Sequence, residues 1–281
     1  MIFTDIKSAI SFLNNSSEIT YDDSFELSKF CAQLISSKEE ENLGRELVIR
    51  VRDAWDKIPE NTKLIWNQLI ESAGLYPYVD PDQLTKSAVI RYEYHKSPFL
   101  QDVYLHEEQQ TLSIELQNKR SVVVSAPTSF GKSLLIEELI ASKVYKQIVI
   151  IQPTLALLDE TRKKLLKYRE TYKIIVSTNQ MPDNVKGNIF LFTGERVVEY
   201  THFPPIEFFI IDEFYKLSLE RDDDRAISLN QALHKLLKFT NKFYMLGPMI
   251  KSIPVNFKQK FDLIWFPTEF ATVAVDEKSL E

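Results

Sequence analysis

One short segment limits the possible folds of this chain more than any other: residues 126–133, which read Ala-Pro-Thr-Ser-Phe-Gly-Lys-Ser. The segment follows a run of mostly β-branched residues, 121–126, and precedes a stretch with helical spacing of apolar residues, 134–140. A Gly-Lys-Ser between a strand and a helix is the context of a phosphate-binding loop. We therefore expect a strand–loop–helix unit with an anion site at the start of its helix.

The residue types in this loop suit that chemistry. Backbone N–H groups and the positive end of the helix dipole form a concave site for polyphosphate. Lys132 can reach the outer phosphates, and the Ser133 hydroxyl can ligate Mg²⁺. Gly131 is needed because a Cβ there would obstruct close approach to a phosphate. The expected nucleotide-binding residues of the loop are Thr128, Ser129, Phe130, Gly131, Lys132 and Ser133.

Two adjacent carboxylates, Asp212 and Glu213, follow a second apolar run, 208–211. If that run is a strand of the same sheet, both acids lie at its carboxyl edge beside the loop. In such sites the first acid holds hydrated Mg²⁺ and the second polarises the attacking water. Lys132, Asp212 and Glu213 are therefore the expected catalytic residues. Ser133 and Asp212 are the expected metal ligands.

Short apolar runs without strict alternation recur after residue 120, which is typical of strands buried on both faces of a parallel sheet. Amphipathic stretches with helical spacing, such as 155–166, separate them. This order predicts an α/β fold, a mostly parallel sheet with helices on both faces. The expected strands are 121–126, 147–151, 173–176, 188–192, 208–211, 242–246 and 261–266.

The first 86 residues read as helices instead. Start signals occur at 22–24 and 59–62, and Pro77 and Pro81 then break the pattern. We expect a small all-α N-terminal domain at residues 1–86 and the sheet domain at residues 87–281. The apolar segments with helical spacing are 6–13, 25–35, 47–55 and 64–70.

Composition limits the possible partners. The chain carries 34 Lys and Arg against 40 Asp and Glu, and its net charge of −6 arises within residues 1–86. A protein that grips nucleic acid through a cationic surface usually has a pI above about 9, whereas the pI here is near 5.5. A nucleic-acid partner must therefore be argued from local motifs.

Targeting and redox signals point to the cytoplasm. No apolar run approaches the roughly 18 residues that a bilayer span needs, so we expect no membrane association. The N-terminus carries Asp5 where a secretory signal carries bases, and the single Cys31 cannot form an internal disulfide. We expect a cytoplasmic protein.

Taken together, these motifs resemble the first RecA-like, ATP-binding domain of a superfamily 2 helicase of the DEAD/DEAH-like group. Gln109, which lies 17 residues before Ala126, stands where this family often has a Gln that reads the adenine edge. The matching segments are 126–133 (motif I), 153–160 (motif Ia), 193–196 (motif Ib), 212–215 (motif II) and 247–248 (motif III).

The resemblance implies a function. The cofactors would be ATP and Mg²⁺, with Gln109 favouring ATP over GTP, and the partner would be DNA or RNA. The contacts with nucleic acid would be made largely by backbone N–H groups, which need little net positive charge. Gly247 and Pro248 would couple the ATP site to the nucleic acid. The implied nucleic-acid contacts are Pro153, Thr154, Gly194, Glu195 and Arg196.

Two departures from the family pattern affect this reading. Motif II continues with the bulky pair Phe214-Tyr215, and Gly247-Pro248 lacks the hydroxyls that normally link motif II to strand separation. The sequence therefore predicts ATP hydrolysis more directly than unwinding. Phe-Tyr versions of motif II are associated with helicase-like proteins of bacterial anti-phage defence.

Helicases of this group clamp ATP between two RecA-like domains, and arginine fingers from the second domain contribute roughly 10³–10⁵ in rate. We expect this chain to be a fragment of a longer protein, or to work with a partner that donates the other half, and to turn over ATP very slowly alone. The alternative hypothesis is a nucleotide-gated interaction module whose helical domain recruits a protein partner.

Overall fold

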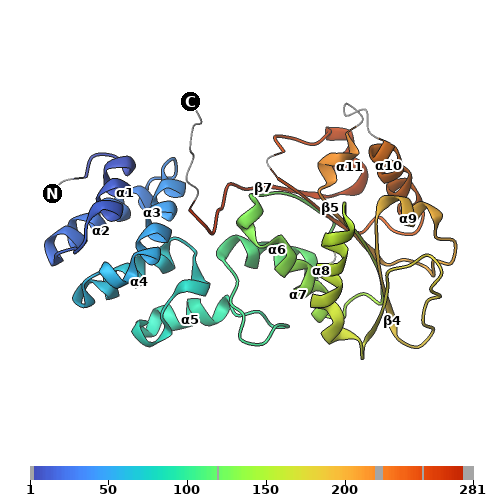
Figure 1. Cartoon of the computed structure of the whole chain (residues 1–281), viewed down its shortest axis with the longest axis horizontal. Helices are drawn as coiled ribbons and strands as arrows, with labels where there is room; N and C mark the ends of the chain where they lie inside the picture. Colours follow the sequence, from blue (N-terminus) through green and yellow to red (C-terminus); the bar gives the residue numbers. More distant parts are fainter. Residues whose placement is uncertain (1–2, 119, 219–223, 249, 275–281) are drawn as a thin grey trace. The chain divides into compact units, whose positions relative to one another are not determined.

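The computed structural model describes residues 3–118, 120–218, 224–248 and 250–274. These residues form two compact units (Figure 1). Unit 1 comprises Met1–Thr111 together with Glu269–Glu281, and unit 2 comprises Leu112–Thr268. Within the described part of the chain, none of the helices is both long and apolar enough to cross a bilayer.

Unit 1 is helical, as the sequence predicts. Its first two long helices begin with side-chain caps: Asp5 accepts the N–H of Ser8, and Thr20 forms a capping box with Asp23. Helix α6 (Glu107–Gln117) leads on into unit 2. The other helices of unit 1 are α1 (Ile6–Asn15), α2 (Tyr21–Ser36), α3 (Glu41–Asp53), α4 (Lys63–Ser72) and α5 (Lys86–Tyr94), with 3₁₀ turns η1 (Trp55–Lys57), η2 (Glu60–Thr62), η3 (Tyr76–Tyr78) and η4 (Pro81–Gln83).

Unit 1 extends beyond residue 86 because α5 and the following segment pack onto the preceding helices. Arg91 pairs with Glu71 at 2.6 Å, and the His95 ring stacks on Tyr76 with centroids 3.5 Å apart. These contacts bind α5 to α4 and η3. The compact units therefore divide within α6, later than the expected division after residue 86.

The segment 269–274 also belongs to unit 1. Phe270 is 1% exposed, and the Arg45 guanidinium lies 4.0 Å from the centre of its ring. The Tyr78 hydroxyl donates to the Thr272 carbonyl at 3.4 Å. The chain thus returns to the helical unit after it has completed the sheet.

Unit 2 is built on a seven-stranded sheet with strand order β3-β4-β2-β5-β6-β1-β7, and every registered pair is parallel. This confirms the predicted α/β fold. The last strand begins later than expected, because Phe261 is still the last residue of α11 and is followed by Asp262 in a left-handed conformation. The strands are β1 (Val122–Ser125), β2 (Gln147–Ile151), β3 (Tyr172–Ile175), β4 (Gly187–Phe192), β5 (Phe208–Asp212), β6 (Phe243–Gly247) and β7 (Ile264–Pro267).

Helices cover both faces of the sheet, with α7 and α8 on one face and α9, α10 and α11 on the other (Figure 1). The connecting helices and turns are α7 (Lys132–Ala141), α8 (Leu155–Leu165), α9 (Gly194–Glu199), α10 (Asp224–Leu236), α11 (Val255–Phe261), η5 (Thr128–Phe130), η6 (Leu166–Tyr168) and η7 (Phe214–Leu217).

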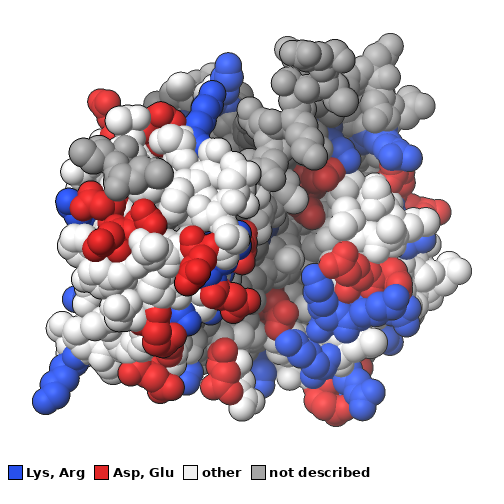
Figure 2. Space-filling model, turned by 60° about the vertical axis from the view of Figure 1, so that its left-hand side comes forward, with Lys and Arg blue, Asp and Glu red and all other residues white. Residues whose placement is uncertain are grey.

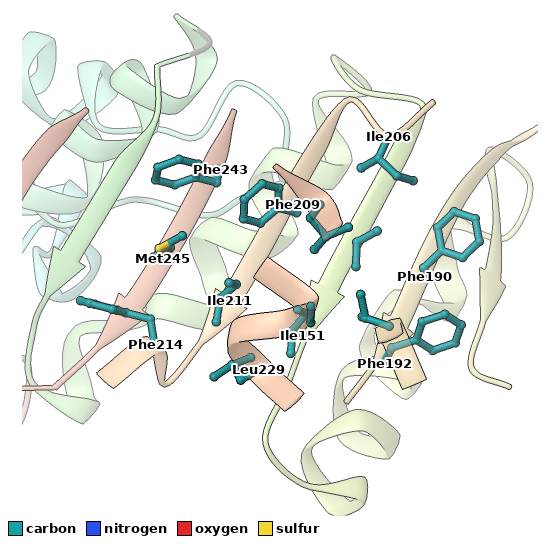
Figure 3. Packing of buried hydrophobic residues seen from close by; sticks show 14 of the residues in the cluster. Ile151, Phe190, Phe192, Ile206, Phe209, Ile211, Phe214, Leu229, Phe243 and Met245 are labelled. Carbon is teal, nitrogen blue, oxygen red and sulfur yellow. The ribbon is translucent and has the colours of Figure 1, made fainter. Parts of the chain in front are cut away.

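Alternation along β5 decides which side chains reach each face. Phe209 and Ile211 point into the apolar cluster beneath α9 and α10 (Figure 3). Phe208 faces the other way and stacks on Tyr145 at 4.5 Å. Since Asp212 shares the face of Phe208, the strand period places this carboxylate on the side that carries α7.

Candidate nucleotide site

The phosphate-binding loop lies between the carboxyl end of β1 and the first turn of α7. Thr128–Phe130 form a 3₁₀ turn, and Gly131 then adopts φ 79° and ψ 32°. That left-handed conformation is open to glycine and costly for residues with a Cβ. Gly131 lets the chain turn into α7, which starts at Lys132. Phe130 is fully buried, so any contact of Phe130 with a nucleotide would involve its backbone.

Lys132 is folded back onto its own loop. Its Nζ donates to the carbonyl oxygens of Ala126 at 3.0 Å and Pro127 at 2.8 Å. Burial lowers the pKa of Lys132, while Asp212 and Glu213 oppose that shift. Because the ammonium already donates to two loop carbonyls, an anion that bound Lys132 would have to replace these acceptors.

Asp212 ends β5 beside Leu246 of β6. Burial raises the pKa of its carboxyl, and the neighbouring Glu213 raises it further. Three contacts act in the opposite direction: the backbone N–H of Glu213, the charge of Lys132 and a side-chain hydrogen bond from Gln152. A cation next to Asp212 would favour its ionised form.

Lys132, Ser133 and Asp212 line one cavity. Its free volume is about 40 Å³, the space of a few water molecules. The structure therefore brings the loop lysine, the loop hydroxyl and the motif II carboxylate together around one space. The remaining lining residues are Ile136, Glu137, Gln152, Thr161, Lys164, Leu165 and Leu246.

Glu213 sits in a left-handed conformation with φ 58° and ψ 44° at the start of η7. Its carboxylate forms an ion pair with Lys216, one turn further along. Both side chains are about one-third exposed. In this arrangement the Glu213 carboxylate is held by Lys216.

The donor set fits Mg²⁺ carried by a nucleotide. Mg²⁺ prefers oxygen ligands and is usually held by one or two protein side chains together with phosphates and waters. The Ser133 hydroxyl and the Asp212 carboxylate supply two such oxygens. Among the described residues, no group of three His, Cys, Asp or Glu is arranged to hold a metal without such help. A further oxygen at the cavity, Gln152 Oε1, is buried and has no hydrogen-bond partner within that same part of the chain.

Residues 106–246 match the DEAD/DEAH box helicase family, and this range contains the loop, Asp212 and Glu213. The chain belongs to this family. Residues 1–89 match a second family, the Anti-bacteriophage protein B N-terminal domain.

Anti-bacteriophage protein B of Escherichia coli (strain K12) is a relative of this helicase-family chain, with 34% identity over 258 residues. The alignment covers 88% of this chain and 35% of the relative. The chain therefore spans about a third of the length of that protein.

In this helicase-family chain, motif III contacts both other motifs without a hydroxyl of its own. The Gly247 carbonyl accepts the N–H of Ala126 at 3.0 Å, and the N–H of Ile250 donates to the Ser125 hydroxyl at 2.6 Å. On the other side, a Cβ built on Gly247 would lie 3.2 Å from the Phe214 ring. The bulky third residue of motif II thus packs where motif III has no side chain.

The residues that the resemblance assigns to nucleic acid lie at neighbouring strand ends. Pro153 and Thr154 follow β2, and Gly194 and Glu195 follow β4, its neighbour in the parallel sheet. Thr154 accepts the N–H of Leu157 at 3.3 Å and caps α8. Because β2 and β4 are parallel, both pairs lie at one edge of the helicase domain, the carboxyl edge that also carries Asp212.

Two of these residues already have structural roles. The Arg196 guanidinium donates to the Val176 carbonyl at 2.8 Å. A Cβ on Gly194 would lie 3.2 Å from the backbone of Leu229, so the glycine allows α9 to pack closely on α10.

Gln109 belongs to unit 1, is buried, and accepts the N–H of His106 through its carboxamide oxygen at 2.9 Å. Its contact with adenine stays a prediction.

Sequence reasoning missed two residues of the helicase domain. Gln152 precedes motif Ia, and nothing in its sequence context marks it as a partner of Asp212. Lys235 of α10 donates to the carbonyls of Val197, Val198 and Tyr200 at 2.6–3.0 Å. A cation at a helix C-terminus is favourable, and this lysine stabilises the end of α9.

Proposed function

We propose that this chain binds ATP with Mg²⁺ and hydrolyses it as the first RecA-like half of a nucleic-acid-dependent helicase or translocase. The observation that carries the proposal is the shared cavity of Lys132, Ser133 and Asp212. These three residues come from the loop, the start of α7 and the end of β5, and they meet only in the folded chain.

Each residue has a defined task in this reaction. Lys132 leaves the Ala126 and Pro127 carbonyls and binds the outer phosphates. Ser133 and Asp212 would hold Mg²⁺, which would neutralise charge on the phosphates. Glu213 leaves Lys216, orients the attacking water and accepts its proton. The water oxygen then bonds to the γ-phosphorus, the bond from that phosphorus to the β–γ bridging oxygen breaks, and ADP leaves.

Efficient turnover requires a second RecA-like domain that supplies arginine fingers, in cis or in trans. We expect these 281 residues alone to bind nucleotide and to hydrolyse it very slowly. The relative's greater length is consistent with additional domains.

Nucleic acid, DNA or RNA, would run along the strand ends that carry Pro153, Thr154, Gly194, Glu195 and Arg196. On the face drawn in Figure 2, Lys and Arg lie among Asp and Glu. On α8, Lys163 and Lys164 each pair with an acid at 2.7 Å. Contacts through backbone N–H groups, which need little net positive charge, therefore suit this domain better than a cationic groove. From the similarity to Anti-bacteriophage protein B we propose that this activity serves anti-phage defence. We expect it to act in the cytoplasm.

The test compares nucleotide binding by the wild-type chain, Lys132→Ala and the control Lys238→Ala, which alters an exposed lysine of the same unit. Loss of a charged hydrogen bond of ~1.5–3 kcal/mol predicts a 10- to 100-fold rise in the Kd for Mg²⁺-ATP in Lys132→Ala alone. Steady-state hydrolysis would then be measured with DNA or RNA added to the full-length protein. Unchanged binding in Lys132→Ala contradicts the proposal.

A second candidate is a nucleotide-gated interaction module. It is favoured by the helical unit 1, whose first 86 residues carry the whole net negative charge and which matches a domain separate from the helicase family. In that case a protein partner binds unit 1 only when the chain has ATP bound. Neither DNA nor RNA then stimulates hydrolysis. Stimulation by either polymer excludes this candidate.

A further inference from the structure

Gln152 lies at the floor of the nucleotide site. It follows β2 directly, and its backbone N–H donates to the Phe192 carbonyl at 3.0 Å, which continues the ladder between β2 and β4. In the β2–β5 register Ile151 is opposite Ile211, so the next residues, Gln152 and Asp212, lie side by side. Gln152 is 5% exposed.

The orientation of the Gln152 carboxamide follows from its partner. Gln152 and Asp212 line the same cavity, and a carboxylate accepts hydrogen bonds, so the amide N–H is the end of the carboxamide that suits Asp212. The carboxamide oxygen must then point elsewhere. It is buried and meets no donor among the described residues. A buried polar atom without a partner is costly, and native proteins usually satisfy such atoms with water or a ligand.

The chemistry of an amide oxygen limits what can complete this contact. The oxygen accepts protons and repels phosphate oxygens. None of the side-chain donors that line the cavity, Lys132, Ser133, Thr161 and Lys164, donates to this oxygen. Waters bound to a divalent cation are strong donors because the cation polarises their O–H bonds. Asp212, held by the other end of the same carboxamide, is where such a cation would sit.

We propose that Gln152 is a positioning residue for the hydrated metal: its amide N–H fixes the Asp212 carboxylate, and its oxygen accepts a hydrogen bond from a metal-bound water. This inference rests on the proposed function and deepens it. Gln152 lies outside the helicase motifs, and through it the hydrated Mg²⁺ would be held in the place where it supports nucleotide binding.

The test substitutes Gln152→Met, which keeps the length and apolar stem and removes both polar ends. The control is Gln231→Met on the exposed side of α10. Binding of a fluorescent ATP analogue is measured twice, with Mg²⁺ and with EDTA. Loss of an outer-shell metal partner typically lowers metal affinity 10- to 100-fold. We therefore expect a Kd raised by at least about tenfold with Mg²⁺ and within twofold of wild type with EDTA, and no change in either condition for the control.

Each other result has one meaning. A Gln152→Met protein that binds as tightly as wild type with Mg²⁺ overturns the inference, and so does an equal loss with Mg²⁺ and with EDTA, which would mark a purely structural role. If Gln152→Met does not fold, Gln152→Asn is used, since it keeps the amide but shortens its reach, and the same two-condition result is expected. A wild-type chain that binds no nucleotide in either condition refutes the proposed function itself.

Discussion

At the scale of single residues, burial favours the neutral forms of two oppositely charged side chains in the site, Lys132 and Asp212. It lowers the pKa of Lys132 and raises the pKa of Asp212. Each shift reflects the cost of keeping a charge away from water. A phosphate against Lys132 and a cation against Asp212 would stabilise both charged forms, so these residues are suited to bind a charged ligand as a pair.

The same cause predicts acid sensitivity in unit 1. Burial lowers the pKa of His106 to about 4 from the ordinary 6.5, despite a hydrogen bond with the Gly74 backbone. Between these pH values His106 binds a proton in the unfolded chain and not in the folded chain. The contribution of His106 to the free energy of unfolding is therefore fully present above about pH 6.5 and is lost as the pH falls toward 4. The loss amounts to about 3 kcal/mol.

Urea unfolding of unit 1 at pH 7 and pH 5 checks this. Wild type and the control His202→Gln, which alters an exposed histidine, should lose stability between the two pH values. His106→Gln should lose clearly less. An equal loss in all three proteins would mean that His106 is not the group responsible.

At the scale of elements, the structure shows how motifs I, II and III are joined. The Ala126 N–H donates to the carbonyl of Gly247, the last residue of β6, and the Ser125 hydroxyl accepts the N–H of Ile250. Phe214 of η7 packs on Gly247. In this chain a ring against a glycine therefore provides a contact between motifs II and III that needs no hydroxyl. A displacement of Glu213, at the start of η7, would move the Phe214 ring against Gly247.

A side chain at Gly247 tests this contact. In Gly247→Ala the new Cβ would lie 2.8 Å from the Ile250 side chain and 3.2 Å from the Phe214 ring. We expect a loss of about 1–3 kcal/mol of stability from overpacking. Phe214→Leu in the same chain should recover part of it, with a coupling energy of about 0.5–3 kcal/mol in a double-mutant cycle by urea unfolding. Strictly additive losses would show that the two residues do not press on each other.

At the scale of the whole molecule, the chain starts in unit 1, builds the sheet of unit 2 and comes back to unit 1 at residue 269. The returning segment is anchored by Phe270 against Arg45, and by Tyr78 on Thr272. The helical unit is therefore completed by residues that follow the helicase domain.

Phe270→Ala should accordingly destabilise unit 1. Truncation of a buried Phe costs about 3–5 kcal/mol, whereas Val273→Ala, which shortens a half-exposed side chain of the same segment, should stay within about 0.5 kcal/mol. A Trp265→Phe background leaves Trp55 and Trp66, both in unit 1, to report its unfolding by fluorescence. Equal stability of Phe270→Ala and its background would show that the return contributes nothing.

The strand and helix order, and the parallel sheet with its loop, followed from sequence because strands buried on both faces and a Gly-Lys-Ser before a helix are local patterns. The same reasoning found Lys132, Ser133 and Asp212 as candidates for one site. Local patterns also located the helical N-terminal region.

What the sequence left undecided depends on contacts between distant residues. The end of unit 1 depends on Arg91 against Glu71 and on Phe270 against Arg45, pairs that no local pattern connects. The link between Gln152 and Asp212 exists only because β2 and β5 are neighbours in register. Side-chain periodicity tells which face of a strand is buried, but only strand order tells which polar side chains meet there. In this protein that order places Gln152 beside Asp212 in the candidate site.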